Sequence, residues 1–159
     1  MDPYKQNRGL SLSLINVISF NNIDVSYVQK NKRQIRVWLK TVIENEQSKI
    51  WNIDYNFCSD KHLIKINKKY LNHDDYTDII TFDLSDGNEI LGDIYISIDR
   101  VKENARKIRV NFSDEILRII VHGVLHLCGY KDKSKKAAAI MRNKENHYLS
   151  LLKEIPNFT

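Results

Sequence analysis

The stretch 113–128, SDEILRIIVHGVLHLC, constrains the fold most, because it is almost entirely apolar yet contains two histidines. Four residues interrupt the apolar pattern at spacings of three, four and four positions: Glu115, Arg118, His122 and His126. An α-helix turns by about 100° per residue, so these four side chains would form one narrow stripe on a helix. The stretch therefore predicts a largely buried helix whose polar stripe carries both histidines.

The residues after this helix supply a stop and an acidic side chain. Gly129 can end the helix in a left-handed backbone conformation that other residues resist. The chain can then fold back and present Asp132, or less simply Tyr130, to the histidines. Histidines at positions i and i+4 of a helix can bind one ion, although such a pair alone is a weak signal. We therefore predict one divalent metal site formed by His122, His126 and Asp132.

A metal held in this way points to hydrolysis. Three protein ligands leave one position on zinc for a water molecule, whose pKa zinc lowers to about 7. We expect His122, His126 and Asp132 to act in catalysis through this metal-bound water. A zinc protease of the His-Glu type needs a glutamate directly after the first histidine as its base, and this chain has Gly123 there. Phosphodiester cleavage needs only the activated water and cations for the phosphate backbone, and lysines lie nearby.

The rest of the chain predicts a small α+β domain. Hydrophobic periodicity and turn residues indicate strands at 16–20, 50–58, 77–84 and 89–98, and helices at 29–46, 60–71, 99–109, 113–128 and 133–153. We expect Asp60 to cap the second helix and Ser113 to cap the helix with the histidines. Helices before, between and after about four strands predict one mixed sheet packed against about five helices, with the metal-binding helix in the core. Residues 1–14 are expected to be an extension, and residues 15–159 a single hydrolase domain.

Composition narrows the compartment and the partners. The formal net charge of +5 is compatible with a polyanionic partner without requiring one. Cys58 and Cys128 are too few for a disulfide framework, which favours a reducing, cytoplasmic location. The segment 10–20, LSLSLINVISF, is interrupted by serines and lacks a cleavage site, so we do not interpret it as a signal peptide. No run approaches the roughly 18 apolar residues of a membrane helix.

Three ordered motifs resemble one known family. HGVLHLCGYKD at 122–132 is similar to the signature of the YbeY family of metal-dependent endoribonucleases, and INKKYLNHDDYTDIITFDL at 66–84 and LGDIYIS at 91–97 resemble its upstream motifs. The resemblance implies an α+β fold, a zinc-type ion in a cleft and no small-molecule cofactor. It also implies single-stranded ribosomal RNA precursors as substrate, a role in ribosomal RNA maturation and ribosome quality control, and partners in the small ribosomal subunit.

Two positions depart from the family pattern. The family commonly has a third histidine where this chain has Asp132, whose negative charge should make a metal-bound water a weaker acid. The family also commonly has an arginine after the tyrosine of the upstream motif, thought to act on the scissile phosphate, where this chain has Leu71. Nearby groups could replace that arginine or bind the substrate, and the sequence does not choose among them: Lys69, His73, Arg118, Lys131 and Lys133.

We therefore predict a metal-dependent endoribonuclease that cleaves single-stranded RNA. A non-catalytic ribosome-assembly factor with a structural metal is the alternative, and Leu71 keeps it open. A metalloprotease ranks third, because Gly123 occupies the position of the expected base.

Overall fold

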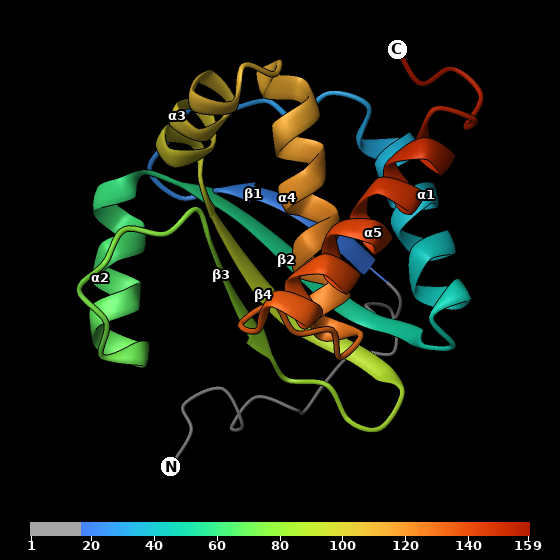
Figure 1. The fold of residues 1–159 in the computed structure, drawn as a ribbon, viewed down its shortest axis with the longest axis horizontal. Coiled ribbons are helices and arrows are strands. Elements are labelled where there is room, and N and C mark those ends of the chain that lie inside the picture. Colours follow the sequence, from blue (N-terminus) through green and yellow to red (C-terminus); the bar gives the residue numbers. More distant parts are fainter. Residues whose placement is uncertain (1–16) are drawn as a thin grey trace.

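A computed structural model describes residues 17–159 and forms one α+β domain with a mixed sheet (Figure 1). The expected extension at 1–14 and the expected strand start at residue 16 lie outside the described residues. The elements in chain order are β1 (Val17–Asn22), α1 (Lys32–Asn45), β2 (Lys49–Cys58), α2 (Asp60–Leu71), β3 (Ile79–Asp83), β4 (Glu89–Ser97), α3 (Ile98–Ile108), α4 (Phe112–Leu127) and α5 (Lys135–Leu152). The predicted α+β class, with four strands and five helices in this range, is confirmed.

The sheet has the strand order β1-β2-β4-β3. β1, β2 and β4 are parallel, whereas β3 forms a hairpin with β4 and runs antiparallel at the edge. Side chains alternate along a strand, so each strand presents residues to both faces of the sheet. In β4, Ile90, Ile94 and Ile96 are buried, while the intervening Asp93 and Tyr95 are only partly buried.

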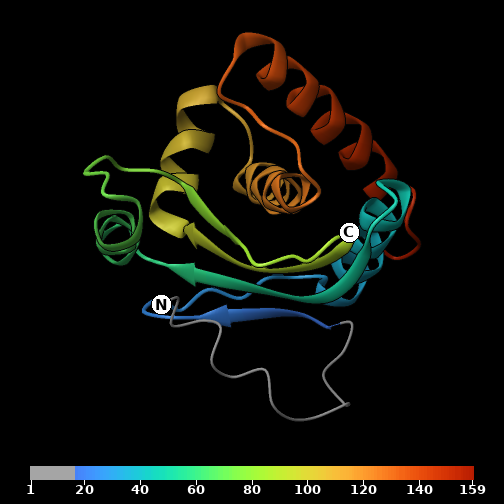
Figure 2. The ribbon, with the colours of Figure 1, turned by 90° about the horizontal axis from the view of Figure 1, so that it is seen from below.

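The main core lies between the sheet and α4, which crosses one face with α3, α5 and α1 around it (Figure 2). Two buried hydrogen bonds fix the layers: Tyr55 donates to the carbonyl of Ile120 at 2.8 Å, and Trp38 donates to that of Tyr148 at 2.7 Å. Gly123 faces the sheet, because a Cβ atom there would lie 3.0 Å from Ile94 and 3.1 Å from Ile79. A side chain larger than glycine would therefore hold α4 away from the sheet.

A smaller cluster lies on the opposite face of the sheet. Leu63 of α2 packs with Cys58 and Ile80, and three partly buried residues surround them: Ile66, Phe82 and Tyr95. α2 therefore lies beside the β3 edge of the sheet (Figure 1), where it packs against residues of β3, β4 and the end of β2. The edge strand β3 consequently has one side against α4 and the other against α2.

The two predicted helix caps are wrong by one and two positions. Ser59, not Asp60, caps α2, and its hydroxyl accepts a 3.1 Å hydrogen bond from the backbone N–H of His62. α4 begins after Asn111, whose carbonyl already accepts from the first turn, so Ser113 lies inside the helix. In both cases a neighbouring residue has the extended backbone that a cap requires.

Two other helices begin later than the sequence pattern indicates. α1 begins at Lys32 instead of residue 29, because Asn31 has a left-handed backbone with φ 56°. α5 begins at Lys135 instead of residue 133, because Ser134 caps it and accepts from the N–H of Ala137 at 3.0 Å. Within residues 17–159, no helix combines the length and the hydropathy that crossing a bilayer requires.

Candidate metal centre

The last turns of α4 and the bend that follows bring the three predicted ligands together. His122 and His126 lie one turn apart on α4. Gly129 adopts a φ of 100°, in the left-handed region predicted for it, and its N–H donates to the carbonyl of His126 at 2.9 Å. Tyr130 then donates to the carbonyl of Leu125 at 3.0 Å, so the end of the helix is closed by backbone hydrogen bonds. The chain reverses here and carries the next residues back toward the histidines.

Three ligand atoms converge at this point. The Nε2 atoms of His122 and His126 lie 2.9 Å apart, and Oδ2 of Asp132 lies 3.3 Å from each. Neighbouring ligands of a tetrahedral zinc ion, with bonds of about 2.1 Å, lie roughly 3.4 Å apart. The residues present therefore fit one such ion. Burial and the electrostatic interaction with the neighbouring His122 hold the pKa of His126 below its usual value, which favours the neutral, metal-binding form of this imidazole.

The remaining ring nitrogen of each histidine has an acceptor. Nδ1 of His122 donates to the carboxylate of Glu145 on α5 at 2.8 Å, and Nδ1 of His126 donates to the carbonyl of Tyr130 at 3.0 Å. Such bonds fix the tautomer and direct Nε2 toward a metal. Burial raises the pKa of Glu145, but hydrogen bonds from His122 and Arg118 outweigh burial and lower the pKa overall. Glu145 is therefore an ionised acceptor at neutral pH.

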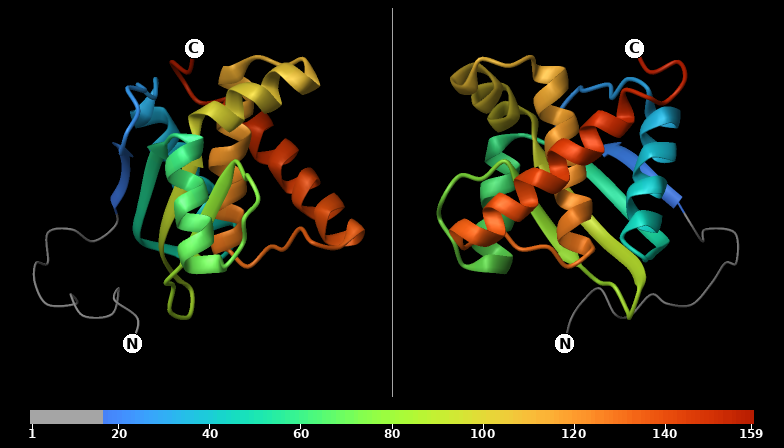
Figure 3. Two further views of the ribbon diagram at one scale, coloured as in Figure 1. Left: turned by 90° about the vertical axis from the view of Figure 1, so that its left-hand side faces the viewer. Right: turned by 45° about the vertical axis from the view of Figure 1, so that its right-hand side comes forward.

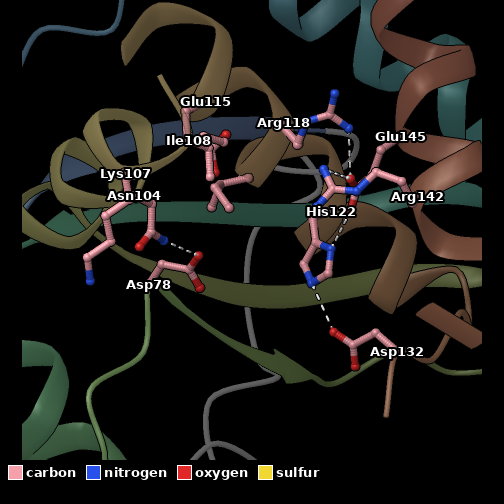
Figure 4. Close-up of a pocket in the computed structure, with 11 residues that line it drawn as sticks. Asp78, Asn104, Lys107, Ile108, Glu115, Arg118, His122, Asp132, Arg142 and Glu145 are labelled. Atoms are coloured by element: carbon pink, nitrogen blue, oxygen red, sulfur yellow. Dashed lines mark hydrogen bonds and ion pairs between the residues drawn. The ribbon is translucent and has the colours of Figure 1, made fainter. Parts of the chain in front are cut away.

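The three ligand candidates adjoin a cleft of about 380 Å³, of which His122 and Asp132 form part of the wall. Figure 4 shows Asp78 at the start of β3 and Asn104 of α3 on one side of the cleft, and α5 with Glu145 on the other. Asn104 donates to Asp78 at 3.0 Å. Burial raises the pKa of Asp78 although the charge of His122 opposes the shift. The cleft thus contains a carboxyl group that takes up a proton more readily than usual.

The charge of the cleft depends on what it binds. Its lining includes four carboxylic acids and three cations: Asp78, Glu115, Asp132, Glu145, Lys107, Arg118 and Arg142. Without a metal, the ionised lining residues have a net negative charge, because the carboxylates outnumber the cations. A bound divalent ion would make the net charge of the cleft positive. Burial also raises the pKa of Glu115, so this carboxyl group takes up a proton more readily than usual. A metal-loaded cleft is therefore the form that can attract a phosphate group.

Arg118 lines the cleft, as expected for a substrate-binding residue. Its guanidinium group, however, already forms hydrogen bonds with two side chains of the protein. Its guanidinium donates to Glu145 and to Asn146, both at 2.9 Å. α5 crosses α4 at this point (Figure 3), so the ion pair joins the two helices beside the metal site. Arg118 thus supports Glu145 in addition to facing the cleft.

The other four predicted substrate-binding residues are not among those that line this cleft. Lys69 lines a separate groove between α2 and the sheet. His73 is exposed in the segment between α2 and β3. Lys131 and Lys133 are exposed on either side of Asp132. Their role in binding RNA remains a prediction.

Sequence reasoning missed Glu145, which supports the metal site from another helix. The available signal was its position, because Met141, Glu145, Tyr148 and Leu152 follow the helical repeat of the buried face of α5. A glutamate among apolar residues at that spacing requires a buried partner. No comparable signal in the sequence pointed to three other residues that line the cleft: Arg142, Asn104 and Lys107.

Comparisons with known proteins identify the fold and the family of the chain. The solution structure of a Thermotoga maritima protein shares the fold, with a TM-score of 0.60 at 24% identity over 88% of this chain and 94% of that one. Proteins from Flavobacterium johnsoniae and Cytophaga hutchinsonii, both described as endoribonuclease YbeY, are 45% and 47% identical over 85% and 86% of this chain and 96% of their own. The sequence model of that family, described as endoribonuclease YbeY, matches residues 16–153. From its motifs, its fold and these relatives, the chain belongs to the endoribonuclease YbeY family.

Proposed function

We propose that the protein is a zinc-dependent endoribonuclease that cleaves single-stranded RNA during ribosomal RNA maturation and ribosome quality control. The observation that carries the proposal is the convergence of two imidazole nitrogens and one carboxylate oxygen, from His122, His126 and Asp132, beside a cleft. The names of the relatives support the reaction class.

Different residues around the cleft would have different roles in this reaction. Zinc bound at the three ligands would supply a Lewis acid for the phosphate and a nucleophile at neutral pH. Glu145 and the carbonyl of Tyr130 hold the ligand imidazoles in the orientation that binds metal. Asp78, whose pKa burial raises, is suited to give a proton to the leaving oxygen. Lys107 and Arg142, both exposed at the cleft, are suited to hold flanking phosphates.

The substrate and the partners follow from the family resemblance and from charge. We assign ribosomal RNA precursors as the substrate and the small ribosomal subunit with its proteins as the partner, in the cytoplasm. The net charge of +5 suits a polyanionic substrate. No small-molecule cofactor is part of the proposal.

A non-catalytic assembly factor is the second candidate. The observation that favours it is Leu71, an uncharged residue that is 46% exposed at the end of α2, where relatives of this type commonly have arginine. A metalloprotease is disfavoured, because Gly123 faces Ile94 and Ile79 of the sheet and a base at that position could not face the metal.

The test compares substrates and metal content together. Zinc-loaded protein is incubated with single-stranded RNA, double-stranded RNA and casein, and only single-stranded RNA should be cut. His126→Ala should abolish cleavage and sharply reduce bound zinc, whereas His147→Ala, which removes an exposed histidine of α5, should change neither. One equivalent of zinc in the His122→Ala/His126→Ala variant, or cleavage of casein alone, would contradict the proposal.

A further inference from the structure

A second cavity of about 290 Å³ lies between α2 and the face of the sheet opposite to α4. We refer to it as the α2 groove, which is lined by His62, Lys65, Ile66, Lys69, Tyr70, Phe82 and Tyr95. Five of these residues belong to one side of α2, and Phe82 and Tyr95 belong to β3 and β4. The groove and the metal centre are therefore separated by the edge strand β3, which contacts α4 on one side and α2 on the other (Figure 1).

The floor of the α2 groove is aromatic. The rings of Tyr70 and Phe82 lie 5.6 Å apart at 79°, and those of Phe82 and Tyr95 lie 5.9 Å apart at 89°. Tyr70 is 40% exposed, and Phe82 is only partly buried. The three rings therefore form one aromatic surface, of which Tyr70 is the most exposed part, and a flat ligand can pack against that surface.

The rim of the α2 groove is basic. Lys65 and Lys69 are exposed and lie one helical turn apart, about 6 Å along the axis of α2. Within residues 17–159, neither lysine forms an ion pair, whereas the neighbouring Lys68 is paired with Asp74 at 2.7 Å. The ammonium of Lys69 instead lies 5.0 Å from the centroid of the Tyr70 ring. Among the residues that the structure describes, no carboxylate lines the groove, so these two charges are available to an anion.

An acidic pair limits the groove on its other side. Asp93 lies opposite Phe82 in the β3–β4 register and beside Asp54 in the β2–β4 register. Burial raises the pKa of Asp93, and repulsion by Asp54, its partner in the register, raises it further. A polyanion is therefore attracted along α2 and repelled from the middle of this face of the sheet.

We propose that the α2 groove binds a single-stranded segment of RNA that lies outside the cleaved region. Aromatic rings that stack on bases and cations that contact the phosphates are the two elements of single-strand recognition. The inference rests on the proposed function, because it identifies a second contact for the same substrate. The RNA would pass over the β3 edge, with its cleaved phosphate at the metal centre and an adjoining base on the rings of the groove. A duplex, whose bases are already stacked, cannot use this floor.

The first experiment tests the charges. Binding of a fluorescein-labelled single-stranded 2′-O-methyl RNA to the zinc-loaded full chain is measured by anisotropy over a range of salt concentrations, and a gel confirms that the probe stays intact. Each phosphate contact contributes a slope of about 0.7 to the plot of log Kd against log salt, so Lys65→Ala/Lys69→Ala should flatten the slope by roughly 1.4. Lys49→Ala/Lys153→Ala removes the same net charge from exposed positions outside the groove and should leave the slope unchanged.

The second experiment tests the aromatic floor. Phe82→Leu should weaken binding of the single strand about tenfold, within the range of base–aromatic stacking, and leave the salt slope unchanged. Phe82→Tyr, which keeps an aromatic ring, should bind the single strand as the parent does. Duplex RNA should bind equally to the parent, Phe82→Leu and Phe82→Tyr. Because Phe82 is partly buried, the melting temperature of each variant is measured, and the more exposed Tyr70→Leu repeats the test where packing matters less.

The outcomes separate this inference from the proposed function. If Lys65→Ala/Lys69→Ala and Tyr70→Leu both bind single-stranded RNA as the parent does, the inference is overturned and a polypeptide becomes the occupant of the groove. The proposed function would stand if such variants still cleave RNA. If the parent cleaves no RNA but the groove variants lose affinity as described, the proposed function fails and the binding site stands.

Discussion

The phenolic hydroxyl of Tyr130 donates a 2.7 Å hydrogen bond to the carboxylate of Glu46, which joins the turn after α4 to the end of α1. Lys144 donates to the same carboxylate at 2.7 Å, and the hydroxyl of Tyr148 also donates to it. The carbonyl of Tyr130 in turn accepts from His126. Glu46 therefore anchors the turn whose geometry determines how the three candidate metal ligands meet.

The first prediction is that Tyr130→Phe weakens zinc binding. Loss of the hydroxyl frees the turn from Glu46, so Asp132 is held less firmly, and outer contacts of this kind typically change metal affinity by about 10-fold or more. Competition with a chromophoric chelator measures the affinity. Tyr76→Phe, at a tyrosine that is 60% exposed, should have no effect.

A double-variant cycle tests whether Tyr130→Phe weakens zinc binding through the position of Asp132. In an Asp132→Ala background, Tyr130→Phe should change zinc affinity much less, because the ligand that the turn positions is already absent. An equal loss in both backgrounds would show that the hydroxyl acts in some other way.

The second prediction concerns pH and Glu46. Burial raises the pKa of Glu46, but hydrogen bonds from Lys144, Tyr148 and Tyr130 outweigh it and hold the pKa below its usual 4.5. A lowered pKa means that the ionised carboxylate stabilises the fold above the unfolded pKa, and that this stabilisation is lost as pH falls through the folded pKa.

Glu46→Gln should therefore lower the free energy of unfolding by about 1–3 kcal/mol at neutral pH. The difference from the parent should shrink as pH falls below 4.5. Urea denaturation at a series of pH values measures it. Glu44→Gln removes an exposed carboxylate whose contact with Lys40 is 3.9 Å, and it should change stability little. A difference that stays constant into acid would refute a role for the ionised carboxylate.

The convergence of the three candidate ligands was predictable because their geometry is local. His122 and His126 are fixed by the helical repeat, and Gly129 marks the stop that returns the chain to Asp132, all within 11 residues of sequence. The strands of the sheet were equally predictable, because alternating hydrophobic residues bounded by turn residues define strands such as β2 and β4. Helix caps failed by one or two positions, because Ser59 and Asn111 compete with neighbours of similar capping propensity.

The supporting contacts were not predictable from the sequence. Glu145 meets His122 across 23 positions and Glu46 meets Tyr130 across 84, so both contacts depend on how whole helices pack. The α2 groove likewise needs the β3–β4 pairing that brings Phe82 beside Tyr95. Helix-crossing and sheet geometry are properties of the assembled core, and no local pattern specifies them.

The third prediction separates support of the metal from support of the fold. Glu145→Gln should reduce zinc affinity by about 10-fold, because His122 loses a charged acceptor. Arg118→Gln breaks the ion pair with Glu145 but leaves the bond from His122, so it should lower stability without a comparable loss of zinc. Chelator competition and urea denaturation of both variants measure the two effects. Unchanged zinc affinity in Glu145→Gln, with a loss of stability as in Arg118→Gln, would assign Glu145 a purely structural role.

The last prediction concerns Leu71, where the family commonly has arginine. Negative charge builds on the non-bridging oxygens during phosphodiester cleavage, and a guanidinium stabilises it with two parallel hydrogen bonds. Leu71 is the last residue of α2 and is 46% exposed, so a longer side chain there should cost little stability. Leu71→Arg should raise cleavage of single-stranded RNA by up to roughly 100-fold, the contribution of one transition-state donor.

Leu71→Lys is the matched control, because it adds the charge without the paired donors and should raise the rate less. A neutral Leu71→Arg would indicate that another cation already serves the phosphate. Alanine substitutions at Lys69, His73, Arg118 and Lys131, extended to Lys107 and Arg142 of the cleft, should then identify it by a fall in the single-turnover rate. If neither the parent nor Leu71→Arg cleaves RNA with zinc bound, and no alanine variant alters RNA binding at the cleft, the nuclease reaction is excluded. The metal centre would then serve a ribosome-assembly factor, as the uncharged side chain at position 71 would suggest.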